Sequence, residues 1–184
     1  MVVKYLIEHC APTLAALKAA NLFNYPFEDP ERLNRQIEVW NGRLQKSGVR
    51  LCLLRQNEHN ALIYVYRVKS LQKILSNSET ARFLQQYGYS GVRPDQAIGT
   101  LQKRLKNMEA GFPHEIGIFL GYPLEDVIGF IQNAGQNCKC CGCWKVYCNE
   151  CEAERTFARY KKCSEIYRRL WNQGRTVMQL TVAA

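Results

Sequence analysis

The chain has 184 residues, of which 47% are hydrophobic, and a formal net charge of +9. A chain of this length can bury a core without cross-links, so we expect one domain spanning residues 1–184. No stretch approaches the roughly 18 uncharged apolar residues of a membrane span, and the charged N-terminal segment does not have the form of a signal peptide. These features exclude a membrane-spanning protein and lead us to expect a cytoplasmic one.

The first third of the sequence predicts two helices followed by a hairpin. Pro12 favours a short helix over residues 13–20, because proline is common in the first turn of a helix. Apolar residues at helical spacing predict a second helix over 30–46. Two apolar runs, 49–54 and 61–67, flank a short polar loop and predict paired strands.

The remaining sequence predicts a mainly helical arrangement with two further short strands. The expected elements are a helical stretch over 70–108 with breaks near Ser76 and at 88–94, a helix after Pro123, a strand over 144–147, a long helix over 149–172 and a final strand over 177–182. Together these elements predict an α+β fold: a helix-rich single domain around a small sheet of about four strands.

Six of the nine cysteines lie in one cysteine-rich segment, residues 137–151. They are Cys138, Cys140, Cys141, Cys143, Cys148 and Cys151. Cysteines at this density are typical of a zinc site, an iron–sulfur site or a thiol–disulfide site. In a reducing cytoplasm we favour metal or redox chemistry over a structural disulfide framework.

The spacing of these six cysteines allows three Cys-x-x-Cys pairs, of which two at a time would supply four metal ligands. The pairs are Cys138/Cys141, Cys140/Cys143 and Cys148/Cys151. If residues 144–147 form a straight strand, the Cα atoms of Cys143 and Cys148 lie roughly 16 Å apart. Sulfurs on one zinc ion lie within about 4 Å of each other. Either the segment folds back to make one site, or the cysteines form separate sites, and the spacing does not distinguish zinc from an iron–sulfur cluster.

Two other interpretations of the cysteine-rich segment stay open. Cys148 and Cys151 lie at the predicted start of the long helix, where the helix dipole lowers a thiol pKa, so they could act as redox thiols without a metal. The cysteines could also be surface residues without a shared role.

A cysteine-dependent enzyme is the alternative function. Cys10 precedes a predicted helix start and would be the nucleophile, with His9 or His114 as the base and Glu115 orienting the histidine. The simpler interpretation is a buried Cys10 and a histidine that satisfies a helix entry.

A basic helix face suggests a third function. Between residues 155 and 175 there are seven basic residues and one acidic residue, and four of the basic ones share a face: Arg155, Arg159, Lys162 and Arg169. This face could bind an acidic partner or nucleic acid, although the sequence lacks a recognisable nucleic-acid motif and we do not expect nucleic acid. Cys163 lies on the opposite, apolar stripe and should be packed in the core.

Several phrases resemble a known family. They are residues 9–23 (HCAPTLAALKAANLF), 112–127 (FPHEIGIFLGYPLEDV), 144–147 (WKVY), 161–163 (KKC) and 180–182 (LTV). Together they resemble a domain-of-unknown-function family of anaerobic, clostridial-type bacteria. The resemblance implies a cytoplasmic protein of an anaerobe and brings no assigned activity or site residues.

The leading hypothesis about function rests on the cysteine-rich segment. We expect a cytoplasmic protein that binds zinc or an iron–sulfur cluster and has an accessory role in redox chemistry or metal handling. A redox or metal-trafficking protein would be its partner.

Overall fold

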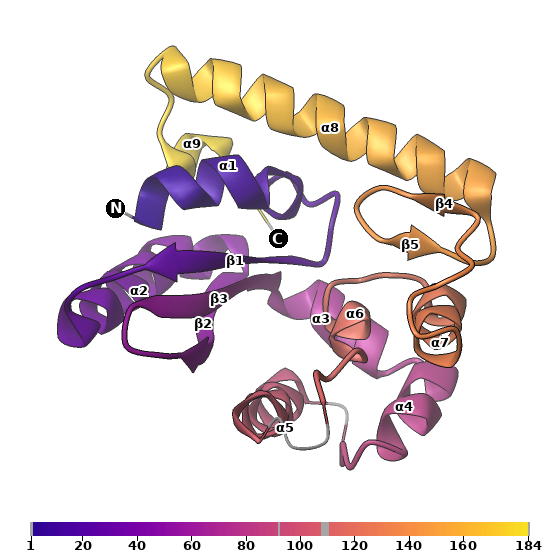
Figure 1. Cartoon of the computed structure of the whole chain (residues 1–184). Helices are drawn as coiled ribbons and strands as arrows, with labels where there is room; N and C mark the ends of the chain where they lie inside the picture. Colours follow the sequence, from indigo (N-terminus) through magenta and orange to yellow (C-terminus); the bar gives the residue numbers. More distant parts are fainter. Residues whose placement is uncertain (1, 92, 108–110, 184) are drawn as a thin grey trace.

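The computed structural model describes residues 2–91, 93–107 and 111–183 (Figure 1). Its elements, in chain order, are α1 (Val2–Leu14), β1 (Ala20–Pro26), α2 (Pro30–Leu44), the short 3-10 helix η1 (Gln45–Ser47), β2 (Val49–Gln56), β3 (Asn60–Arg67), α3 (Val68–Leu75), α4 (Ser78–Gln85), α5 (Pro94–Lys106), α6 (Ile116–Phe119), α7 (Leu124–Gln132), β4 (Cys140–Cys141), β5 (Lys145–Val146), α8 (Glu150–Asn172) and α9 (Val177–Leu180). The predicted helical stretch ended at Met108, which lies outside the described residues.

A three-stranded antiparallel sheet with the order β1-β3-β2 lies at the centre of the fold. The predicted hairpin is confirmed as β2 and β3, and its register shifts between Leu53 and Arg55. A separate two-stranded ribbon is formed by β4 and β5. The α+β class is therefore confirmed, with the strands divided between a sheet of three and a ribbon of two.

The predicted helix over residues 13–20 is wrong, because α1 ends at Leu14 and β1 begins at Ala20. β1 pairs along its whole length with β3, from Ala20 opposite Tyr66 to Pro26 opposite Asn60. That pairing joins residues about forty positions apart, and local helix propensity contains no information about it.

The predicted strand over residues 177–182 is also wrong, because this segment contains the short helix α9. Thr176 and Gln179 form a capping box, in which each side chain bonds the backbone N–H of the other residue. Val177 and Leu180, one helical turn apart, are both buried. The capping residues explain why apolar residues that alternate with polar ones form a helical turn here.

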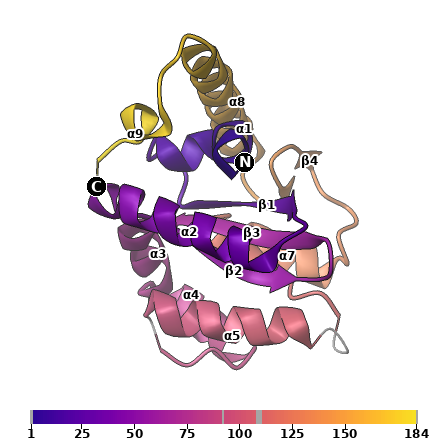
Figure 2. The same cartoon turned by 90° about the vertical axis from the view of Figure 1, so that its left-hand side faces the viewer.

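The sheet separates two clusters of buried side chains. On β3, Ile63 and Val65 belong to one cluster and Tyr64 and Tyr66 to the other, as expected when successive strand residues point to opposite faces. The first cluster includes side chains of α1, α2 and α9, with α8 packed against it, and the second includes side chains of α3 to α7. In Figure 2, α1, α8 and α9 lie on one side of the sheet and α3, α4 and α5 on the other.

The 23-residue helix α8 crosses α1 and reaches the cysteine-rich ribbon at its N-terminal end (Figure 1). Cys163 is 7% exposed on the inner stripe of α8, which confirms the prediction that it is packed in the core. None of the helices in the described ranges combines the length and apolar character that crossing a bilayer requires.

Candidate metal centre on the cysteine-rich ribbon

The cysteine-rich segment folds into a tight hairpin, the ribbon of β4 and β5. Cys140 pairs with Val146 and Cys141 with Lys145, and the N–H of Gly142 donates to the carbonyl of Trp144 at 3.0 Å. Cys143 therefore lies in the turn, and Cys148 lies beyond the other end of β5. The segment therefore folds back on itself and does not run as the straight strand that would hold Cys143 and Cys148 far apart.

Asp126 of α7 anchors the ribbon. Its buried carboxylate accepts hydrogen bonds from the indole Nε1 of Trp144 at 2.7 Å, from the N–H of Tyr147 at 2.7 Å and from the N–H of Cys148 at 3.0 Å. Burial alone would raise the pKa of Asp126, but these hydrogen bonds outweigh it and hold that pKa below its ordinary value. An ionised Asp126 thus joins both ends of β5 to α7.

Two glycines let the ribbon approach its neighbouring helices closely. A Cβ atom at Gly129 of α7 would lie 2.5 Å from Cγ of Tyr147. A Cβ atom at Gly142 in the ribbon turn would overlap the ring of Phe157 on α8. The ribbon is therefore packed between α7 and α8 at positions where only glycine leaves room.

Cys140 meets two carboxylates of α8. The Sγ atom of Cys140 and one carboxylate oxygen each of Glu150 and Glu154 all lie within 4.8 Å of one another. Glu150 and Glu154 are four residues apart, so their side chains lie on the same helix face. Partial desolvation, followed by the negative charges of Glu150, Glu154 and Cys138, raises the pKa of Cys140. Within the described part of the chain, no other group of three or more Cys, His, Asp or Glu side chains is this compact.

The other cysteines of the segment point to different surroundings. Cys143 lies near the ammonium of Lys18, where burial lowers the pKa of that lysine and the charge of Cys143 offsets only part of the effect. Cys141 lines a cleft beside α7. Cys151 is exposed in the first turn of α8, and all nine thiols of the chain are free. In the described residues the six predicted ligands do not converge on one site with four thiolates.

The predicted lowering of the Cys148 pKa by the helix dipole is wrong. Cys148 precedes the N-cap residue Asn149, and its thiol donates to Oδ1 of Asp126 at 3.2 Å. Desolvation and this hydrogen bond raise the pKa of Cys148. Cys148 therefore lacks the activated thiolate that the sequence suggested for it.

Comparison with models of protein families assigns the chain to a family. Residues 6–181 match the model of a family described as protein of unknown function, DUF3793. The chain belongs to the DUF3793 family. This confirms the resemblance to a domain of unknown function. Comparisons with curated proteins and with solved structures gave no match.

In this DUF3793 protein, Cys10 is fully buried in the first core cluster. Burial raises the pKa of its thiol strongly, and the nearby Lys18 only partly offsets this effect. A nucleophilic cysteine needs the opposite, a lowered pKa and access for the substrate. The structure therefore gives Cys10 the simpler role of a core residue.

The proposed partners of Cys10 are engaged elsewhere. His9 is exposed and stacks on Phe23 at a centroid distance of 5.7 Å, and His114 packs against Phe130 at 4.9 Å. Glu115, 1% exposed, pairs with Nε of Arg104 at 2.5 Å and accepts a hydrogen bond from Tyr89 at 2.9 Å. Glu115 therefore holds the structure of the second cluster together, and it does not orient a histidine.

The basic face of α8 is exposed at each of its four predicted residues, Arg155, Arg159, Lys162 and Arg169. An exposed basic face is also the ordinary state of a solvated helix. Binding of an acidic partner at this face stays a prediction.

Proposed function

We propose that this protein binds a divalent transition-metal ion, zinc or ferrous iron, and handles it for a partner protein. The observation that carries the proposal is the convergence of Cys140, Glu150 and Glu154. In a tetrahedral zinc site, with Zn–S near 2.3 Å and Zn–O near 2.1 Å, sulfur and oxygen ligands lie about 3.6 Å apart. The three side chains need only small rotations to reach that separation.

The donor set favours a single ion over an iron–sulfur cluster. Clusters are held by several cysteine thiolates, whereas this group offers one thiolate and two carboxylates. Cys138, whose charge acts on Cys140, could supply a second thiolate. Three or four anionic ligands attract a dication strongly, and the mixture of sulfur and oxygen suits zinc or ferrous iron.

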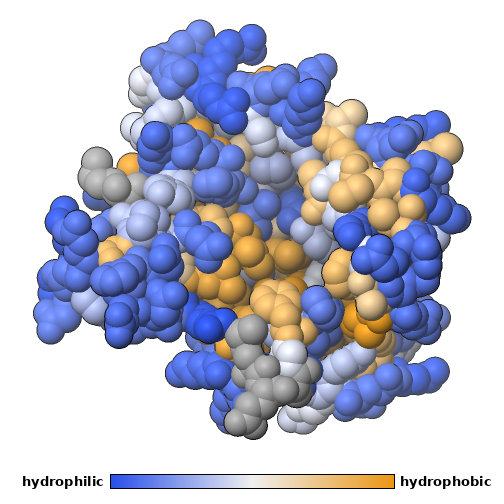
Figure 3. All heavy atoms as spheres, in the orientation of Figure 1, coloured by the Kyte–Doolittle hydropathy of each residue, from blue (hydrophilic) through white to orange (hydrophobic). Residues whose placement is uncertain are grey.

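The exposure of the group supports a handling role. Glu150 and Glu154 are exposed, and Cys140 is half-buried. Structural zinc sites are closed by four protein ligands, whereas an open site leaves positions for an incoming ligand. The space-filling view shows hydrophobic-coloured residues over the ribbon region within a hydrophilic surround, a surface on which a metal-trafficking or redox partner would dock (Figure 3).

The first experiment is elemental analysis and visible spectroscopy of the full chain purified without oxygen, followed by cobalt titration. We expect about one zinc or iron ion per chain, no brown chromophore, and a cobalt–thiolate absorption band that appears on titration. Absence of metal together with no cobalt binding would overturn the proposal. A brown chromophore would replace the single ion with an iron–sulfur cluster.

Matched variants locate the site. Cys140→Ser, and separately Glu150→Gln combined with Glu154→Gln, should weaken zinc affinity in a chelator competition by more than about tenfold, since even outer partners of ligands are worth roughly 10–100-fold. Cys143→Ser in the same ribbon and Glu165→Gln on the same helix are the controls and should retain affinity. Equal losses in Cys140→Ser and Cys143→Ser would contradict the assigned ligands.

A further inference from the structure

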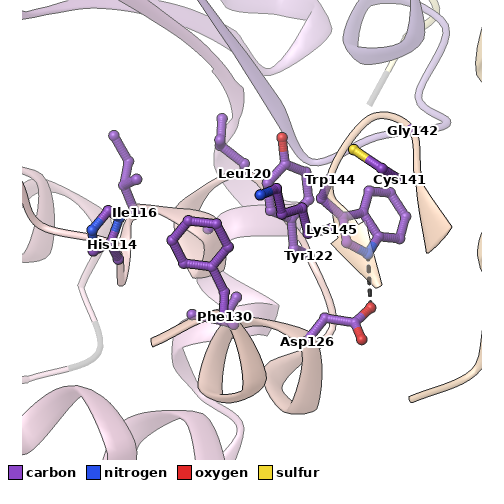
Figure 4. A pocket seen from close by; sticks show the side chains of 12 residues that line it. His114, Ile116, Leu120, Tyr122, Asp126, Phe130, Cys141, Gly142, Trp144 and Lys145 are labelled. Carbon is purple, nitrogen blue, oxygen red and sulfur yellow. Dashed lines mark hydrogen bonds between the residues drawn. The ribbon is translucent and has the colours of Figure 1, made fainter. Parts of the chain in front are cut away.

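On the other side of the ribbon lies a cleft of about 270 Å³, bounded by α6, α7 and the ribbon (Figure 4). Its lining includes Ile116, Leu120, Tyr122, Phe130, Trp144 and Lys145. Cys140, Glu150 and Glu154 are not among the lining residues. The cleft is therefore a feature distinct from the metal group and can be tested independently of it.

The walls of the cleft are largely aromatic. Tyr122 and Trp144 stack with a centroid distance of 5.0 Å and an interplanar angle of 27°. Phe130 packs on His114 across the cleft from this pair, as the close-up shows (Figure 4). The indole of Trp144 is fixed by its hydrogen bond to Asp126 and by an edge contact with Phe157 at 4.5 Å. Flat walls held in place by such contacts favour a planar, apolar ligand body.

One positive charge faces this apolar space. The ammonium of Lys145 donates a hydrogen bond to the carbonyl of Gly135 at 2.7 Å and lies 5.9 Å from the centroid of Phe130. An ammonium carries three donors, so a ligand can use those that Gly135 does not. The carboxylate of Asp126 also borders the cleft, but donors from Trp144 and the backbone already engage both of its oxygens.

We propose that the cleft binds a small aromatic carboxylate. The ring would lie between the Tyr122–Trp144 pair and Phe130, with its carboxylate on the ammonium of Lys145. The volume is adequate, since an apolar cavity of about 150 Å³ already holds benzene. A carboxylate on an ammonium forms a charge-assisted hydrogen bond, which supplies the specificity that apolar walls lack.

The test uses benzoate as the probe and benzamide, its neutral match in shape, as the comparison, both followed by saturation-transfer NMR. We expect benzoate to bind the wild-type chain about fivefold more tightly than benzamide, because charged hydrogen bonds are about twice as strong as neutral ones. Equal affinity for the two probes, or no binding of benzoate, would overturn the proposal.

Lysine variants test whether Lys145 supplies the positive charge that binds the carboxylate. Lys145→Met should remove the preference for benzoate, whereas Lys145→Arg should retain it. Lys139→Met is the matched control, because Lys139 lies on the same ribbon and its ammonium bonds the carbonyl of Cys148 at 2.8 Å, outside the cleft lining. Cys141 is exposed and lines the cleft, so the larger side chain of Cys141→Phe should fill the cleft and block the binding of both probes. Unchanged benzoate binding in Lys145→Met or in Cys141→Phe would refute the site.

Discussion

The packing of the ribbon on α7 can be tested at a single glycine, Gly129. An alanine there would place its Cβ 2.5 Å from Cγ and 2.6 Å from Cβ of Tyr147. Carbon atoms in contact prefer about 3.5–4.0 Å, so the two groups must separate by about 1 Å. These are the base atoms of Tyr147, close to its backbone. The ribbon or the helix must therefore move as a whole.

The magnitude of the Gly129→Ala effect follows from two opposing contributions. Alanine in place of glycine in a helix stabilises by about 0.5–1 kcal/mol. Overpacking of a filled site costs about 1–3 kcal/mol. The cost of the clash exceeds the gain in helix propensity, so we expect the free energy of unfolding to fall by about 1–2 kcal/mol. For a chain of this size that loss lowers the Tm by about 2–8 °C.

Thermal denaturation followed by circular dichroism measures this loss, and Gly99→Ala is the control. Gly99 lies in α5, and nothing lies within 4 Å of the position its Cβ would take. Gly99→Ala should therefore raise the Tm, since only the helix propensity changes. If Gly129→Ala raised the Tm by a similar amount, Tyr147 would not pack on α7 and the account of the ribbon would be wrong.

Two buried charges supply further predictions. Arg104→Met leaves Glu115 buried without its cationic partner, so the free energy of unfolding measured by urea denaturation should fall by about 3 kcal/mol. Arg93→Met is the control: it removes an exposed ion pair and should lower the free energy of unfolding by at most about 1 kcal/mol. Equal losses would contradict the structural role of Glu115. Burial lowers the pKa of Lys18 to about 8, and nearby thiols only partly offset this. Between about pH 8 and 10.5, Lys18 is therefore protonated in the unfolded chain but not in the folded one. Over this range the free energy of unfolding of the wild type should rise with pH, relative to that of Lys18→Met, by up to about 3 kcal/mol. A pH-independent difference between the two proteins would show that Lys18 is not buried.

The sequence predicted the elements whose signals are local. The hairpin of β2 and β3 joins neighbouring segments, and its apolar runs border a polar loop, so it was recognisable without tertiary information. β1 was missed because its pairing, such as Ala20 with Tyr66, is long-range. β4 was missed for another reason, since a strand of two residues, Cys140 and Cys141, leaves no periodicity to recognise.

The candidate site was predicted in part. The cysteine-rich segment was identified from composition, but Glu150 and Glu154 were not, because only the turn of the ribbon brings them to Cys140. Asp126 was a visible acid in the first turn of α7, where an acid is explained by the helix dipole alone. Its four bonds to the ribbon depend on the placement of β5 against α7, a tertiary contact without a sequence signal.

The alternation of β4 gives two of the clustered cysteines, Cys140 and Cys141, different surroundings. Successive residues of a strand point to opposite faces, so Cys140 faces the carboxylates of α8 while Cys141 faces the cleft beside α7. Adjacent cysteines therefore serve two different environments, although the sequence suggests one shared site. Cys140 and Cys141 are neighbours on one strand, so the candidate metal group and the cleft share β4. If zinc changes the affinity for benzoate, benzoate must change the affinity for zinc by the same factor.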